Sequence, residues 1–199
     1  YNPYENHSNG NAYKPEAPSK ENQHYLGTDT TSRDILARLI YGTRIALMFS
    51  LAFMACVYII GISIGCAMGY FGGIFDLAFQ RLIEIWSNIP FLYMVIIVFS
   101  VIPSNFSVPT RIAILLTVMV LFSWPTMTYY MRIETYKEKS RDYIAAARII
   151  GASNTRIIFS HILPNVLSTL VTFMPFIIVS AISAITALDF LGFGLPPPT

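Results

Sequence analysis

The chain has 199 residues, of which 54% are hydrophobic and only 12% are charged, and its formal net charge is +2. Ordinary soluble domains carry about 25% charged residues, so this composition excludes a typical soluble domain. Four stretches contain no Asp, Glu, Lys or Arg, namely 45–75, 85–110, 112–131 and 157–188. Because a helix that crosses a bilayer needs about 20 apolar residues, the sequence predicts an all-α integral membrane protein, a polytopic helix bundle.

The first 44 residues differ in composition from the rest of the chain. Residues 1–26 are rich in Asn, Pro, Tyr, Ser and Lys and lack apolar periodicity, which is typical of an irregular segment. Thr31 and Asp34 have the spacing of a capping box, and the apolar residues that follow share one side of a helix. We therefore expect an extracytoplasmic segment over 1–44 that contains an amphipathic interfacial helix at about 31–42.

The apolar stretches predict four transmembrane helices, since each is long enough, or nearly so, to cross about 30 Å of hydrocarbon. The predicted spans lie at about 45–69, 85–102, 112–131 and 166–188. Together they form a transmembrane domain over 45–199. The chain begins with Tyr1 and ends on Thr199 after three prolines, so we expect further residues at both ends.

The connection at 132–165 is rich in basic residues. It contains Arg132, Lys137, Lys139, Arg141, Arg148 and Arg156. The positive-inside rule assigns such a connection to the cytoplasm. Residues 1–44 carry equal numbers of basic and acidic side chains, and four crossings place them on the opposite side.

The sequence offers little for catalysis within this chain. It contains no Walker A loop, zinc-binding helix or plausible Ser-His-Asp set, so we expect no enzyme, no bound metal or cofactor, and no nucleic-acid partner. His161 has no carboxylate or thiol within ten residues and is interpreted as a structural histidine. The predicted spans also lack ionisable Asp, Glu, Lys, Arg and His, which disfavours an ion-coupled carrier, although sodium bound by backbone carbonyls leaves that class open.

Proline interrupts three predicted spans, where it frees a backbone carbonyl and kinks the helix unless neighbours compensate. Such kinks suit a transport pathway, but proline is common in membrane helices, and a structural role is the alternative. A polar pair just inside the second span favours a position facing protein or water, and a tryptophan beside one proline could form part of a ligand cage or simply pack. The candidate pathway residues are Ser87, Asn88, Pro90, Trp124, Pro125 and Pro175.

The connection between the third and fourth spans is too long for a turn and too regular for an irregular loop. Good helix formers run from Lys137 to Ile150, and Gly151 can end this helix in a left-handed conformation. Ser153 or Asn154 can then cap a second helix. The sequence therefore predicts a cytoplasmic helix-turn-helix that ends where Pro164 marks the entry to the last span.

Alanines at 145–147 leave little side-chain bulk on this connection. The surface of another protein could therefore approach the backbone closely there. A solvated, positively charged loop explains the same composition equally well.

The connection resembles a known signature at this point. Ala146-Ala147, three residues, Gly151 and then Leu163-Pro164 are similar to the EAA loop of ABC importer permeases, Glu-Ala-Ala-x3-Gly-x9-Ile-x-Leu-Pro. The resemblance implies that this loop forms a coupling helix that docks in a groove on a cytoplasmic ATPase.

The chain departs from that signature at two positions. Ala145 stands in place of the glutamate, and His161 stands in place of the isoleucine, as is common in the peptide and nickel branch. Ser32 also occupies a position where that branch usually has glycine. Further stretches resemble the same branch, namely 26–29, 33–44, 69–73, 83–87 and 188–196.

The combination is similar to the C-type permeases of dipeptide, oligopeptide and Yej-type importers, the last of which take up peptides and microcin C. This resemblance implies a type I permease fold of six spans, of which the sequence contains four. It also implies a bacterial inner-membrane subunit that transports peptides with a second homologous permease, two ABC ATPases docked on the loop at 142–164 and a periplasmic peptide-binding protein. ATP and Mg would be bound by the partner subunits.

The coupling residues that the resemblance implies are Ala145, Ala146, Ala147, Arg148, Gly151, Ala152, Ser153, Arg156, Leu163 and Pro164. A self-sufficient secondary carrier or channel is the alternative function. A membrane-embedded structural subunit is a further one.

Overall fold

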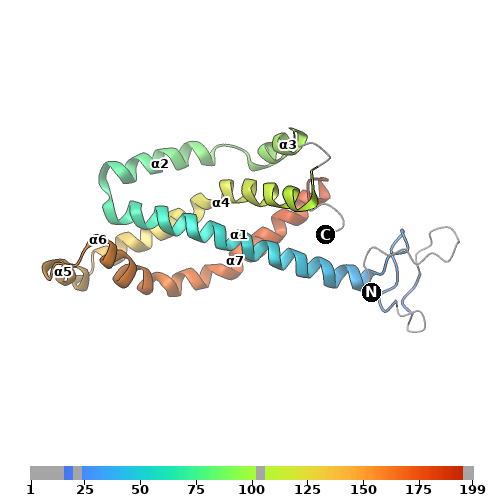
Figure 1. The fold of residues 1–199 in the computed structure, drawn as a ribbon, viewed down its shortest axis with the longest axis horizontal. Coiled ribbons are helices and arrows are strands. Elements are labelled where there is room, and N and C mark those ends of the chain that lie inside the picture. The colour runs from blue at the N-terminus through green and yellow to red at the C-terminus, as the bar shows by residue number, and fades with distance from the viewer. Residues whose placement is uncertain (1–15, 20–23, 102–105, 195–199) are drawn as a thin grey trace. The chain divides into compact units, whose positions relative to one another are not determined.

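The computed structural model describes residues 16–19, 24–101 and 106–194 (Figure 1). They divide into two compact units, one up to Phe49 and the other from Ser50 to Gly194. The elements are α1 (Ile35–Phe71), α2 (Gly73–Ser87), α3 (Phe91–Val101), α4 (Val108–Lys139), α5 (Asp142–Ile149), α6 (Asn154–Arg156), the π-helix η1 (Ile157–Ile162) and α7 (Leu163–Phe190). The predicted all-helical class is confirmed for the described residues.

A carboxylate-bound turn precedes α1 in the first unit. Asp29 Oδ1 accepts hydrogen bonds from the backbone N–H groups of Thr31, at 2.8 Å, and Arg33, at 3.0 Å. Burial raises the pKa of Asp29, but hydrogen bonds from the Thr31 hydroxyl, from these two N–H groups and from the Arg38 guanidinium outweigh it and bring the pKa down to about 2. Ser32, within this turn, has a φ of 57°, a left-handed conformation that glycine adopts most easily.

The first helix begins later than the capping-box pattern predicts. The side chain of Asp34 accepts from the N–H of Ala37 at 2.9 Å, so Asp34 rather than Thr31 satisfies the first turn. From Ile35 the helix continues for 37 residues without a break at the expected end of the interfacial helix. No proline interrupts this stretch, so the predicted interfacial helix and first span belong to one helix.

Helix α1 packs closely against α4 in the second unit. Its contact face carries Gly61, Gly65 and Gly69, at every fourth residue. A Cβ atom added to these glycines would lie 2.6 Å from Met127 Cβ, Thr128 O and Arg132 O, respectively. The backbones therefore approach so closely that even an alanine would have to push the helices apart.

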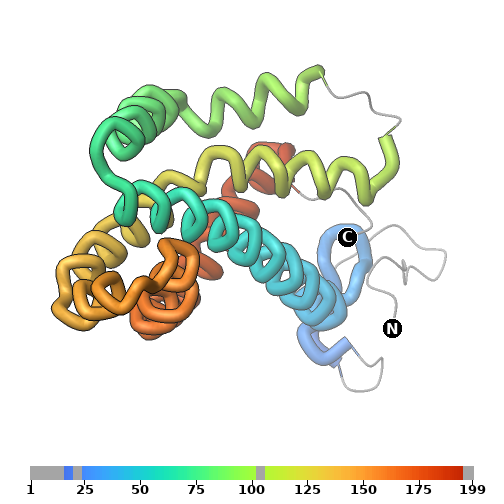
Figure 2. Tube along the Cα trace, turned by 60° about the vertical axis from the view of Figure 1, so that its left-hand side comes forward, coloured from blue at the N-terminus to red at the C-terminus, as the bar shows by residue number. Residues whose placement is uncertain are grey.

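The chain reverses direction between α1 and α2 (Figure 2). Gly72 and Gly73 form the turn, with φ of 66° and 58°, which glycine tolerates best. Residues 70–84 separate the first two predicted spans, and the sequence therefore predicts a connection there, but they are largely helix α2. Its charged residues suggest a loop in the sequence, but Asp76 accepts from both Gln80 Nε2 and the Arg132 guanidinium of α4, so they are accommodated within a helix.

The second predicted span, 85–102, is divided between two helices. Helices α2 and α3 are bent by 71° at the break between them. Pro90 at this break lacks an N–H and disfavours a helical residue before it, which explains the bend. Among the residues that the structure describes, three helices, or four if the bent pair counts as one span, are long and apolar enough to cross a membrane, in line with the four predicted spans.

A hydrogen bond from Trp86 joins α2 to α4 beside a proline. Pro125 lies inside α4 and cannot donate to the carbonyl of Leu121, four residues earlier. The indole Nε1 of Trp86 donates to this carbonyl instead, at 2.7 Å. The neighbouring helix thus compensates for the missing helical hydrogen bond.

The close α1–α4 contact predicts a large effect of one added methyl group. We expect Gly65→Ala to lower the free energy of unfolding of the purified protein in detergent by about 1–3 kcal/mol, because overpacking forces backbone shifts. Gly42→Ala is the matched control, since a Cβ there meets nothing within 4 Å and alanine favours helix. Equal stability of the two variants would contradict the packing argument.

The Trp86 contact predicts a coupled effect with Pro125. Trp86→Phe should cost about 0.5–1.5 kcal/mol of stability, the usual contribution of one hydrogen bond. In a Pro125→Ala background the same substitution should cost less, because the substituted alanine has an N–H that can donate to the Leu121 carbonyl. A double-mutant cycle on the free energy of unfolding measures this difference, and equal costs in both backgrounds would refute it.

Candidate functional site

The chain between α4 and α7 folds into two short helices joined by a tight turn (Figure 1). Gly151 has a φ of 88°, and its N–H donates to Arg148 O at 3.0 Å. Ser153 then caps α6 by accepting from the N–H of Arg156 at 3.4 Å. These features confirm the predicted helix-turn-helix and its break at Gly151.

The helix boundaries in this connection differ from the predicted ones. Helix α4 continues to Lys139 instead of ending near 131, and a new helix starts at Asp142. At the other end, α6 leads through η1 into α7 without a break, and Pro164 lies in the first turn of α7, directly after the π-helix. The second short helix is therefore continuous with the last predicted span.

The inner face of the connection is apolar. Ile144, Ile157 and Ile162 have no exposed surface and form one cluster with Tyr70 of α1. Burying each such side chain contributes roughly 1.5–3 kcal/mol. This cluster fixes the turn against the end of α1.

A chain of hydrogen bonds fixes the same connection to its flanking helices. The Tyr143 hydroxyl donates to Glu138 Oε2 at 2.6 Å and accepts from Asn165 Nδ2 at 2.9 Å, and Arg141 Nε donates to Glu138 Oε1 at 2.8 Å. Burial and the bond to the Glu138 carboxylate raise the pKa of Tyr143. The network joins the end of α4, helix α5 and the start of α7.

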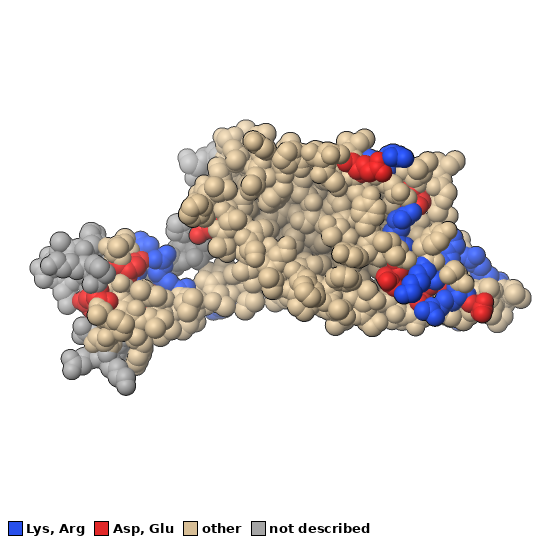
Figure 3. Space-filling view, turned by 180° about the vertical axis from the view of Figure 1, so that it is seen from behind, with Lys and Arg blue, Asp and Glu red and all other residues tan. Residues whose placement is uncertain are grey.

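The outer face of the connection combines apolar and basic side chains. Ile149 and Ile150 are 87% and 86% exposed, and the basic residues Arg148 and Arg156 of the same connection are exposed as well. Figure 3 shows Lys and Arg side chains, together with Asp and Glu, gathered at the end of the second unit that carries α5, whereas the middle of that face is uncharged. Two neighbouring isoleucines exposed to this extent favour contact with another protein.

The predicted coupling residues lie mostly on this outer face. The exposed ones are Ala145, Ala146, Arg148, Gly151, Ser153, Arg156 and Pro164, and the partly buried ones are Ala147, Ala152 and Leu163. Sequence reasoning did not include Ile149 among them, although it lies one helical turn after Ala145. Their role in coupling stays a prediction.

The six predicted pathway residues do not come together. Trp124 and Pro125 are buried, and Trp124 packs in a core cluster with Met68 and Ile83. The other four are exposed, three at the bend between α2 and α3 and Pro175 within α7. At the bend, Asn88 Nδ2 donates to the Glu84 carbonyl at 2.6 Å.

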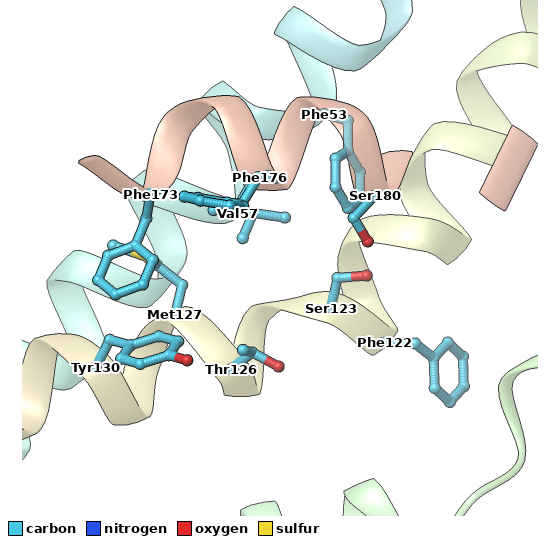
Figure 4. Close-up of a pocket in the computed structure, with 11 residues that line it drawn as sticks. Phe53, Val57, Phe122, Ser123, Thr126, Met127, Tyr130, Phe173, Phe176 and Ser180 are labelled. Carbon is cyan, nitrogen blue, oxygen red and sulfur yellow. The ribbon is translucent and has the colours of Figure 1, made fainter. Parts of the chain in front are cut away.

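A cavity of about 550 Å³ lies between α1, α4 and α7 (Figure 4). Its wall is apolar and aromatic with four hydroxyl groups, and it is formed by Phe53, Val57, Phe122, Ser123, Thr126, Met127, Tyr130, Phe173, Phe176, Ile177 and Ser180. Ser123 and Thr126, which flank the Trp124-Pro125 pair, and Phe176, which follows Pro175, contribute to this wall. The predicted prolines therefore shape helices around the cavity rather than line it, and the pathway assignment stays a prediction.

Comparison with known proteins identifies related chains. Residues 61–199 match the family model described as binding-protein-dependent transport system inner membrane component. The chain is 43% identical over 176 residues to the peptidoglycan transport system permease protein YejE of Agrobacterium fabrum, covering 88% of this chain and 45% of that protein.

Two further relatives show similar coverage. The inner membrane ABC transporter permease protein YejE of Escherichia coli K12 is 43% identical over 182 residues, 92% of this chain and 51% of that protein. The dipeptide transport system permease protein DppC of Haemophilus influenzae is 39% identical over 177 residues, 87% of this chain and 57% of that protein. The chain thus spans about half the length of these relatives.

Proposed function

Because this chain belongs to the family of inner membrane components of binding-protein-dependent transport systems, we propose that it is a permease subunit of an ABC importer that moves peptides across the bacterial inner membrane. The family is one of polytopic permeases that work with ATPase and substrate-binding partners. Proteins of this family lie in the inner membrane, and the apolar helices of this chain suit that location.

The exposed apolar pair at the end of α5 is the observation that carries the proposal. Ile149 and Ile150 lie beside the Gly151 turn, on a connection whose inner face is fixed by the isoleucine cluster and the Glu138 network. A rigid turn with an apolar outer tip is suited to insert into a groove of a partner. Its basic neighbours, Arg148 and Arg156, would add contacts with acidic groups at the rim.

The partners of the proposed importer follow the family pattern. A second homologous permease completes the pathway, two ABC ATPases dock on the loop at 142–164, and a periplasmic binding protein delivers the peptide. ATP and Mg are bound by the ATPases, and no catalytic residue or cofactor is assigned to this chain. Energy therefore enters through the docked subunits.

The proposed mechanism is alternating access driven by differential binding. The ATPases need only favour one of two permease states over the other when they bind and hydrolyse ATP. Displacement of the turn reaches α4 and α7 directly, because the Glu138–Tyr143–Asn165 bonds join both helices to α5. The helices then open the pathway to one side or the other.

Peptides are the proposed substrate class because the relatives are named for the transport of molecules that contain peptides. One relative is named for dipeptide transport, one for peptidoglycan transport, and others for oligopeptide transport. Peptidoglycan fragments carry peptide stems, and a microcin C-like peptide fits the same class. A self-sufficient carrier is the alternative, and transport by the purified chain alone would favour it.

Docking through the isoleucine pair predicts a loss of ATPase association. We expect Ile149→Ser combined with Ile150→Ser to weaken co-purification of the ATPase subunits by at least about tenfold, since burial of one isoleucine contributes roughly 1.5–3 kcal/mol. Peptide uptake should fall with it. Ile59→Ser, at an isoleucine of α1 that is 68% exposed, is the matched control, and unchanged association in the double variant would overturn the docking surface.

The orientation of the chain can be tested in intact cells. A membrane-impermeant thiol reagent should fail to label Ser153→Cys, because the connection at 132–165 is predicted to face the cytoplasm. The same reagent should label Tyr25→Cys, whose side chain is 57% exposed in the first unit. The native Cys56 and Cys66 lie in a predicted span, and labelling of Ser153→Cys from outside would reverse the proposed topology.

A further inference from the structure

Tyr70 occupies an unusual position in the last turn of α1. Its side chain is nearly buried, with 4% of its surface exposed, and its hydroxyl donates to Asn154 Oδ1 at 2.7 Å. Its ring lies 5.7 Å from Lys139 Nζ and 5.4 Å from Arg148 Cζ, distances at which a cation is attracted to an aromatic face. One side chain thus contacts the end of α4, helix α5 and helix α6.

The contacts of Tyr70 bridge parts of the chain that are far apart in sequence. Helices α4 and α7 flank the connection that contains the Gly151 turn, so movement of that turn reaches them along the chain. Helix α1 has no such connection and responds only through contacts in space. Tyr70 makes such contacts, and its apolar ring also packs in the cluster of Ile144, Ile157 and Ile162.

The surroundings of Tyr70 hold it in a defined place. Gly69 allows the end of α1 to approach the backbone of Arg132, and beyond the Gly72-Gly73 turn the carboxylate of Asp76 binds the guanidinium of the same arginine. The corner between α1 and α2 is therefore fixed to α4 on both sides of Tyr70. A side chain held in this way transmits displacement instead of absorbing it.

We propose that Tyr70 is a positioning residue that ties the end of α1 to the α5–α6 turn, so that movement of the turn displaces α1 during transport. This inference rests on the proposed function, because it takes the turn as the part that an ATPase moves. Two components carry the connection. The hydroxyl bond to Asn154 fixes the start of α6, and the contacts of the ring with Lys139 and Arg148 fix α5 relative to the end of α4.

The test uses the complete importer, reconstituted with its ATPases, second permease and binding protein. The measured quantity is peptide taken up per ATP hydrolysed. Tyr70→Leu removes the hydroxyl and the ring, and we expect it to lower this ratio roughly tenfold, within the usual range for coupling between sites. Tyr70→Phe keeps the ring that both cations contact and should lower the ratio less.

A matched control separates this role from general damage. Tyr93→Leu makes the same change at a tyrosine of α3 that is 67% exposed, and it should leave the ratio unchanged. The amount of assembled complex and its thermal midpoint are measured for every variant, because a merely structural role would lower these without changing uptake per ATP. An unchanged ratio in Tyr70→Leu overturns the inference.

A milder pair of variants keeps the inference testable if Tyr70→Leu does not assemble. Tyr70→Phe and Asn154→Ala each remove one partner of the same hydrogen bond, and Asn154 is exposed. The two should lower the ratio by similar factors, and the double variant should lower it no further than either alone. Multiplicative effects would overturn the role of this bond, whereas absence of ATP-dependent uptake in the unmodified importer would overturn the proposed function itself.

Discussion

The close approach of α1 and α4 is the constraint on which the rest of the second unit depends. A Cβ atom added to Gly65 or Gly69 of α1 would lie 2.6 Å from a backbone oxygen of α4, and one added to Gly61 would lie 2.6 Å from the Met127 side chain. This contact fixes the position of the C-terminal end of α1 along α4. Tyr70, in the last turn of α1, therefore lies beside the turn between α5 and α6. It also brings Asp76, at the start of α2, within reach of Arg132. Without it, neither contact could form in the same geometry.

The connection between α4 and α7 has a buried inner face and an exposed outer face. Its inner isoleucines are completely buried, and the carboxylate of Glu138 is satisfied by Tyr143 and Arg141. Its outer isoleucines remain exposed although the helices beside them are well packed. A short helix of eight residues is marginal in isolation, so the inner contacts are what keep the outer face in one shape. Rigidity before docking lowers the entropic cost of docking.

The sequence predicted those features that local patterns determine. Apolar length identified the membrane helices, and Gly151 and Ser153 marked the turn, because each depends on residues close together in the chain. The charged residues of 70–84 suggested a loop, but the structure has helix α2 there, because Asp76 binds Arg132, 56 residues away in the chain. The contact between Trp86 and the Leu121 carbonyl and the contacts of Tyr70 were equally out of reach, since pairs this distant follow from packing and not from spacing.

The missing signature glutamate is consistent with the surface that the structure presents. Ala145 and Ile149 are four residues apart on α5, as are Ala146 and Ile150, so each small side chain lies one turn from an exposed isoleucine. A carboxylate at position 145 would have to be desolvated beside this apolar pair, at a cost unless a cation met it. Alanine removes that cost and lets a groove close over both isoleucines. In the proposed docking, apolar burial therefore takes the place of the charged contact. Arg148 and Arg156 remain at the rim, where partial solvation keeps the desolvation free energy of their charges small.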